Sequence, residues 1–181
     1  MKYSDEEILK LIGSTDRKEY GFNVLVHMYQ KRLYWVIRRM VITHEDTDDA
    51  LQNVFLKVWK SIDSFKAESQ IYTWVHRIAV NEALGLLRKK RKRFFIPMVD
   101  VEEVLASRLT VEDGFEGDEI QVKLQKAVLM LPEKQRLVFN LKYFEEMKYS
   151  DMSDVLSISE GGLKAQYHHA VKKIKEILEM D

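Results

Sequence analysis

Cysteine is absent from this 181-residue chain, and glycine and proline are scarce, with 7 and 2 residues. The lack of cysteine excludes disulfide frameworks, thiolate nucleophiles, iron–sulfur clusters and cysteine-containing zinc sites, and it fits a reducing cytosol. No apolar run approaches the roughly 18 residues of a membrane span, and acidic residues occupy the N-terminus, where a signal peptide needs an apolar core. We therefore expect a cytoplasmic protein with no membrane insertion.

Positive and negative charges are equal in number but unevenly distributed along the chain. Residues 1–98 hold 18 basic and 12 acidic side chains, residues 99–119 hold 1 and 8, and residues 120–181 hold 10 and 9. This order predicts two modules joined by a solvated acidic linker, with affinity for polyanions concentrated in the first module. We place an N-terminal domain at residues 1–97, the linker at 98–118 and a C-terminal domain at 119–181.

Apolar residues recur with the 3.6-residue period of a helix in both modules, and strict strand alternation is nearly absent. The predicted apolar faces are Tyr29, Leu33, Val36, Ile37 and Met40; Leu51, Val54, Phe55, Val58 and Ile62; Ile71, Trp74, Val75, Ile78 and Ala79; and Ile120, Leu124, Ala127, Val128 and Leu131. Ser4 with Glu7 resembles a capping box that opens a first helix, and Gly13 is a plausible stop for it. The pattern predicts an all-α fold of two small helical domains.

The last 50 residues resemble two helices joined by a tight turn. Pro132 and Glu133 suit a helix start, and a helix over Ser150–Leu156 precedes the turn at 157–159. The final helix is expected to bury Leu163, Tyr167, Ala170, Val171, Ile174 and Leu178. The spacing supports equally a helix-turn-helix that enters the major groove, with Ser159 as its cap, and an ordinary helical hairpin.

The segment from Phe65 to Arg93 combines aromatic and basic residues and ends in six consecutive basic side chains, residues 88–93. Single-stranded nucleic acid is bound by such a combination, because aromatic rings stack on bases while cations follow the backbone. Trp74 lies on a predicted apolar face, which favours a role in the core. Tyr72 and His76 point off that face and are expected to be exposed.

Acidic residues gather at Glu45, Asp46, Asp48 and Asp49, ahead of Gln52. Their spacing lacks the glycine turn of a calcium loop, which makes a metal site a weak interpretation. Helix-dipole complementarity and a protein-docking surface are the alternatives. No phosphate-cradling glycine loop, nucleophile elbow or paired-histidine zinc motif is present, so we expect no enzyme, no metal and no cofactor.

Three ordered stretches resemble one family, the extracytoplasmic-function (ECF) sigma factors of the bacterial sigma-70 family. Residues 48–59 resemble the part that docks on core RNA polymerase, and residues 72–83 resemble the part that opens the -10 promoter element. Residues 131–136, with Tyr143 and Phe144, resemble the entry to the domain whose helix-turn-helix reads the -35 element. The resemblance implies a sigma-2-like bundle, a sigma-4-like domain, binding to core polymerase and to double-stranded and melted promoter DNA, and an anti-sigma factor as a partner.

Carried over residue by residue, the resemblance assigns three sets of side chains. Polymerase docking falls to Asp48, Asp49, Gln52, Asn53 and Phe55. Contacts with the -10 region fall to Phe65, Tyr72, Trp74, His76, Arg77, Asn81, Arg88, Lys89, Lys90 and Arg91. Contacts with the -35 element fall to Ser159, Glu160, Gly162, Lys164, Gln166 and His169.

Several residues depart from the family pattern. Asn53 stands where Glu is usual, which removes a docking charge, and Gln166 and His169 replace two habitual arginines. Gln can still read adenine in the major groove. The alternative functions are a helix-turn-helix regulator that binds duplex DNA without core polymerase, and a helical adaptor that binds only proteins.

Overall fold

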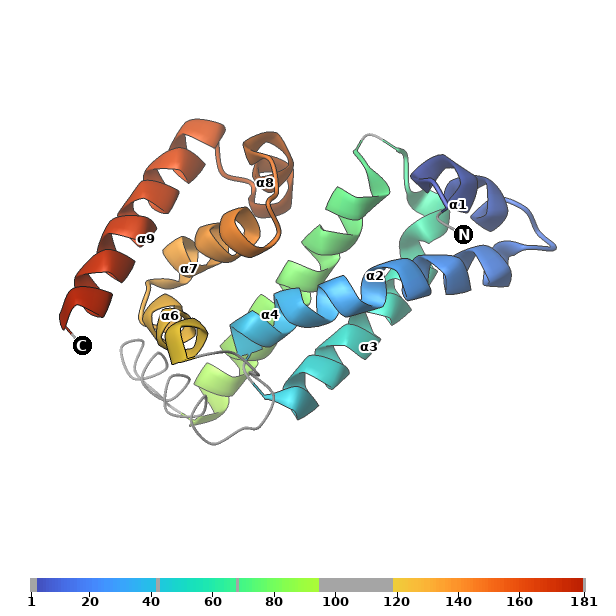
Figure 1. Ribbon diagram of the computed structural model, residues 1–181. Coiled ribbons are helices and arrows are strands. Elements are labelled where there is room, and N and C mark those ends of the chain that lie inside the picture. The colour runs from blue at the N-terminus through green and yellow to red at the C-terminus, as the bar shows by residue number, and fades with distance from the viewer. Residues whose placement is uncertain (1–2, 42, 68, 95–118, 181) are drawn as a thin grey trace.

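The structure is a computed structural model that describes residues 3–41, 43–67, 69–94 and 119–180 (Figure 1). The helices are α1 (Asp5–Ile12), α2 (Lys18–Val41), α3 (His44–Ser61), η1 (Ile62–Ser64), α4 (Ile71–Phe94), α6 (Glu119–Leu129), α7 (Glu133–Phe139), the π-helical η2 (Asn140–Phe144), α8 (Tyr149–Leu156) and α9 (Glu160–Met180). No strand occurs among the described residues, so the predicted all-α class is confirmed. None of the described helices is long and apolar enough to span a bilayer.

Helices α1 to α4 form the N-terminal bundle. The predicted capping box is present: Ser4 Oγ accepts a hydrogen bond from the Glu7 amide, and the Glu7 carboxylate accepts one from the Ser4 amide. Helix α1 ends at the Gly13 cap and packs closely on α2. A Cβ on Gly21 would lie 2.8 Å from the backbone nitrogen of Ile12, so only glycine permits this approach.

Helices α6 to α9 form the C-terminal group, in which α8, a turn and α9 make the predicted helical pair. Ser157 adopts a left-handed conformation with φ 55° at the end of α8. Ser159 Oγ accepts a hydrogen bond from the Gly162 amide at 3.3 Å and thereby caps the first turn of α9. Two predicted core positions are instead at the surface: Ile120 is 75% exposed and Leu178 is 38% exposed, because both lie near helix ends with little packed over them.

The two helical groups pack against each other. Helix α8 lies on α4. One apolar cluster joins the N-terminal bundle to seven buried residues of the C-terminal group, namely Leu137, Val138, Leu141, Met147, Met152, Val155 and Leu163. A second cluster lies within the C-terminal group, around Val128, Phe139 and Ala170. The predicted linker at 98–118 lies outside the described residues, and the domain boundaries remain predictions.

Candidate nucleic-acid and protein-binding surfaces

An exposed stripe runs along α3 and consists of Asp49, Gln52, Asn53, Leu56 and Lys60. Steps of three and four residues place all five on one helix face. We call this face the docking stripe. Leu56 is 51% exposed at its centre, and sequence reasoning missed it. The sequence did hold a signal for Leu56, because it is an apolar residue that does not fall on the predicted buried face of this helix.

The other predicted docking residues differ in their surroundings. Asp48 is exposed, whereas Phe55 is partly buried, with its ring 6.5 Å from that of Phe22. Asp46 contacts the ammonium of Lys90 and the hydroxyl of Thr43, the cap of α3. Asp46 therefore serves local pairing and complements the helix dipole. The described part of the chain holds no group of three acidic or histidine side chains arranged to bind a metal ion.

One face of α4 is open and carries the aromatic and polar groups suited to unpaired bases. The Trp74 ring lies 5.0 Å from that of Phe65, with an interplanar angle of 43°. Arg77, Asn81 and Arg88 are exposed and follow Trp74 at helical spacing. We call these five residues the open face. An aromatic pair beside an exposed amide can stack on a base and hydrogen-bond its edge.

Tyr72 and His76 lie on the opposite side of α4, because each is two residues from Trp74 and a residue turns a helix by about 100°. The prediction that both are exposed is wrong for His76, which is completely buried, and Tyr72 is half-buried with its hydroxyl inaccessible. The His76 Nδ1–H donates to the Tyr72 carbonyl oxygen at 2.8 Å. Their burial has a tertiary cause. Tyr72 lies against Tyr29 and Arg32 of α2, and His76 Nε2 lies 3.9 Å from the carboxylate of Glu145.

The basic run at the end of α4 is only partly unpaired. Arg88 and Lys89 are exposed, but Lys90 is bound to Asp46. The partner of Lys90 lies outside the run, 44 residues away in the sequence. Arg91 falls outside the residues whose side chains the structure describes.

A buried carboxylate lies between the helical groups. Glu145, with a 6% exposed side chain, accepts a hydrogen bond from Arg32 Nε at 3.1 Å and another from Arg39 Nη1 at 3.2 Å. Burial raises the pKa of Glu145, but His76, Arg39 and Arg32 together hold it below its usual value. Sequence reasoning missed Glu145, because its partners are distant in sequence and no local pattern marks the pairing.

Four of the six residues predicted to contact the -35 element are exposed at or near the start of α9, and Gln166 and Gly162 are half-buried. Lys164 is exposed, with its ammonium 3.9 Å from Glu160. Gln166 is half-buried and projects about 160° away from Lys164, at the edge of the apolar stripe. Ala165, His168 and His169 are exposed as well, so they share the open side of α9 with Lys164.

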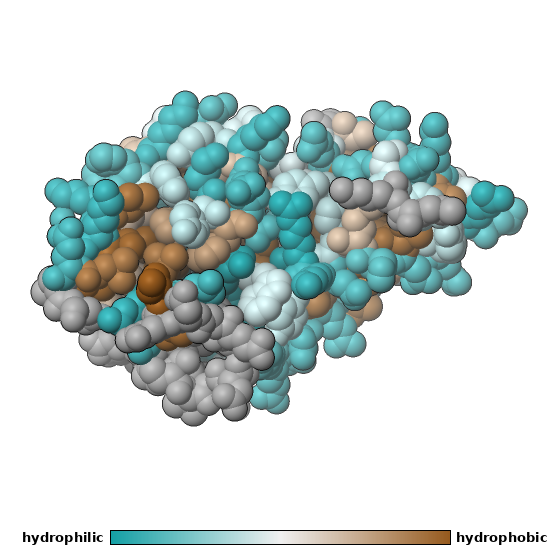
Figure 2. Space-filling view, in the orientation of Figure 1, coloured by the Kyte–Doolittle hydropathy of each residue, from teal (hydrophilic) through white to brown (hydrophobic). Residues whose placement is uncertain are grey.

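The remaining exposed positions of the predicted set, Ser159 and Glu160, lie at the start of α9, while Gly162 is half-buried. A Cβ on Gly162 would meet Ile158 at 3.1 Å and the capping hydroxyl of Ser159 at 3.2 Å. In Figure 2, hydrophobic side chains gather on the visible face over the C-terminal helices. Exposed apolar residues of this group include Met130 and Tyr143.

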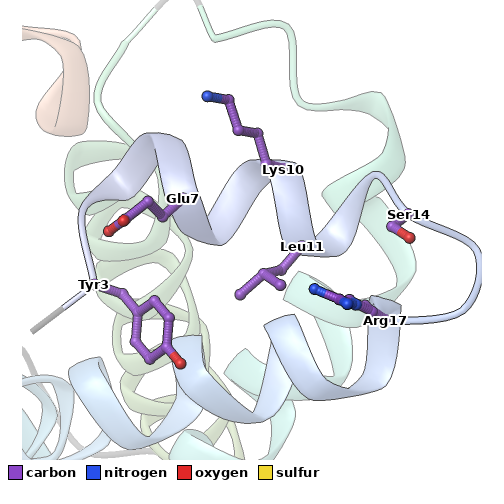
Figure 3. A pocket seen from close by; sticks show the side chains of 6 residues that line it. All are labelled: Tyr3, Glu7, Lys10, Leu11, Ser14 and Arg17. Carbon is purple, nitrogen blue, oxygen red and sulfur yellow. The ribbon is translucent and has the colours of Figure 1, made fainter. Parts of the chain in front are cut away.

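A cavity of about 380 Å³ lies beside α1 and is open to solvent (Figure 3). Its lining residues are Tyr3, Glu7, Lys10, Leu11, Ser14 and Arg17. None of these belongs to the docking stripe, the open face or α9. Glu7 is already engaged in the capping box, so the cavity holds no convergent set of polar groups that would indicate chemistry.

Comparison with known proteins gives consistent matches over both helical groups. The family Sigma-70 region 2 matches residues 25–93, and Sigma-70, region 4 matches residues 121–174. The ECF RNA polymerase sigma factor SigW of Bacillus subtilis is 26% identical over 87% of this chain and 89% of that protein. The ECF RNA polymerase sigma factor SigM of Mycobacterium tuberculosis is 29% identical over 97% of this chain and 85% of that protein.

A solved structure has the same fold. The sigma factor RpoE from Bartonella quintana, in complex with the anti-sigma factor NepR, superimposes with a TM-score of 0.71 at 22% identity. The match covers 88% of this chain and 98% of that one.

Proposed function

The chain belongs to the ECF sigma factors of the sigma-70 family, and from this premise we propose which surface carries each step of transcription initiation. As an initiation factor it binds core RNA polymerase, recognises the -35 and -10 promoter elements and promotes melting. The presence of both sigma regions in order on one chain carries this conclusion. We propose that it acts in the cytoplasm and catalyses no reaction itself.

The docking stripe on α3 is proposed to bind core polymerase. Asp49, Gln52 and Asn53 supply polar groups, and Leu56 supplies an apolar anchor among them. An apolar centre with a polar rim is the usual anatomy of a protein interface. Phe55 is partly buried against Phe22 and is proposed to support the stripe through packing.

The open face of α4 is proposed to promote melting of the -10 element. Phe65 and Trp74 can stack on an unpaired base, and Asn81 can hydrogen-bond its edge. Arg77 and Arg88 are exposed on the same face and can bind the phosphate backbone of the strand. Melting then follows from differential binding, because these contacts form only with unpaired bases and shift the equilibrium toward the opened strand.

The start of α9 is proposed to read the -35 element. Lys164 suits a phosphate contact, while His168 and His169 lie on the exposed side with room to reach bases. Ser159 and Glu160 lie at the exposed first turn, where amide groups can meet a phosphate. Gln166 is a weaker candidate for a base contact, because it is half-buried within the protein.

An anti-sigma factor is a proposed partner. A protein of the same fold is known in complex with one, and this chain presents two helical groups that such a partner could hold together. The alternative of a regulator that acts without polymerase is not favoured, because the region 2 match covers the part of the chain that would then have no role.

Run-off transcription with core RNA polymerase and a genomic promoter library tests the proposal. Specific transcripts that depend on this protein are the expected result. Pull-down with core enzyme separates the proposal from the alternative: a DNA-binding protein that never retains core enzyme and supports no transcripts would contradict it.

A further inference from the structure

Two adjacent histidines, His168 and His169, lie on the open side of α9. Both are exposed, and their ring centres lie 6.0 Å apart with an interplanar angle of 70°. We propose that these two histidines bind phosphates of the -35 duplex in their protonated form, so that affinity for the promoter rises as the pH falls. This proposal rests on the proposed function of α9 and adds a regulation of that same surface.

The packing of α9 keeps both rings available to a ligand. Leu163, Ala170 and Ile174 are buried and define the apolar stripe of this helix, against which α6, α7 and α8 pack. A residue turns a helix by about 100°, which places His168 and His169 about 120–140° from the centre of the stripe, one on each side. Both rings therefore point away from the three neighbouring helices and toward the surface that would meet DNA.

The position of the histidines along α9 fits a contact with phosphates. They lie eight and nine residues after Glu160, the first residue of the helix, which is about 12–14 Å along the axis at about 1.5 Å per residue. A recognition helix enters the major groove by its N-terminal end, and the groove is about 12 Å wide. When the start of α9 lies in the groove, the histidines therefore lie near its edge, where the phosphates of the bordering strand run.

The charges of α9 itself offer no anion to an imidazolium at these positions. The side chains one helical turn from either histidine are Lys164, Ala165, Gln166, Val171, Lys172 and Lys173, of which none is acidic. Glu160 and Glu176 lie two turns away, and their carboxylates are 3.9 Å from the ammonium groups of Lys164 and Lys172. The nearest carboxylates on the helix thus already face lysines.

The elements packed beside α9 offer no such anion either. Their ionisable side chains are Lys123 and Lys126 of α6; Glu133, Lys134 and Arg136 of α7; Lys142 and Tyr143 of η2; and Tyr149, Asp151 and Asp154 of α8. Tyr149 reaches the edge of the open side, where its ring centre lies 5.6 Å from the Lys164 ammonium. Within the described part of the chain, none of these groups forms an ion pair with His168 or His169. DNA phosphate is therefore the anion that an imidazolium on this surface would meet.

Histidine chemistry then couples DNA binding to proton uptake. The ordinary pKa of histidine is about 6.5, so its charge changes close to neutral pH. An imidazolium donates charge-assisted hydrogen bonds to a phosphate and displaces a counterion from it, whereas a neutral imidazole carries no charge to do so. Because the bound state holds more protons than the free state, lowering the pH tightens binding, and raising the pH removes the gain.

The test compares promoter affinity at pH 6.0 and pH 8.0. The full chain, assembled with core RNA polymerase, is titrated against a fluorescently labelled promoter duplex obtained by run-off transcription. The parent chain should bind about fivefold more tightly at pH 6.0, since an exposed ion pair contributes about a factor of two to three at each histidine. The dependence of log affinity on log salt concentration should also be steeper at pH 6.0, by about one to two units.

Three variants assign the effect to this pair. The double variant His168→Gln with His169→Gln keeps polar side chains but cannot titrate, so its affinity should change little between the two pH values. The double variant His168→Lys with His169→Lys carries a fixed charge and should bind at both pH values about as tightly as the parent chain does at pH 6.0. His27→Gln is the matched control, because His27 is an exposed histidine of α2 outside the proposed surfaces, and it should respond to pH like the parent chain.

The outcomes separate this proposal from the function on which it rests. A glutamine double variant that keeps the pH response of the parent chain would overturn the proposal. Equal weakening of that variant at both pH values would overturn it as well, because the histidines would then contact DNA without taking up protons. Failure of the proposed function would look different, since Lys164→Ala would then leave promoter affinity unchanged at either pH.

Discussion

Replacement of Leu56 tests whether the docking stripe binds core polymerase through an apolar anchor. Complete burial of a leucine side chain contributes about 1.5–3 kcal/mol. Because 51% of Leu56 is exposed, docking can bury about half of it, which is worth roughly 1 kcal/mol. Leu56→Ala should therefore weaken binding about fivefold. Leu56→Asp should weaken it about a hundredfold, because docking would also desolvate an unpaired carboxylate.

The assay is titration of fluorescently labelled protein with core enzyme, combined with thermal unfolding of each variant. Leu56→Met conserves volume and should bind like the parent chain. Tyr20→Ala is the second control, since Tyr20 is 53% exposed on α2 and does not belong to the stripe. Unchanged affinity of a folded Leu56→Asp protein would refute the anchor. Equal weakening by Tyr20→Ala would show that the effect is not specific to the stripe.

Four further outcomes are expected. Ser4→Ala should lower the free energy of unfolding by about 1 kcal/mol in urea titrations, because it removes the cap of α1; an unchanged midpoint would contradict this role. Asn81→Ala should reduce permanganate reactivity of promoter complexes on duplex DNA, and a pre-melted bubble should restore binding. Lys164→Ala should weaken binding at all promoters and reduce the salt slope by about one unit in filter-binding assays. The pKa of Glu145 is held below the usual carboxyl value of 4.5, so the ionised side chain stabilises the fold at any pH above 4.5. This contribution is lost as the pH falls through the lowered pKa. The stability difference between the parent chain and Glu145→Gln, measured by urea unfolding, should therefore shrink below that pH.

Local patterns in the sequence predicted the helices well. Ser4 and Glu7 form the expected capping box, because all of its parts lie within four residues. Ile71, Val75 and Ala79 are buried as their spacing indicates, since any helix in a bundle must cover its apolar stripe. These features depend on neighbours along the chain and therefore need no knowledge of the tertiary arrangement.

Features that join distant segments were not predictable in this way. His76 has the spacing of a solvent-facing residue relative to the apolar face of α4, yet it is completely buried, with the Glu145 carboxylate 3.9 Å from its Nε2. Lys90 looked like part of an unrelieved basic run, but Asp46 neutralises it from another helix. Glu145 is 113 residues from Arg32, and a single exposed-looking charge in a sequence carries no sign of such a partner.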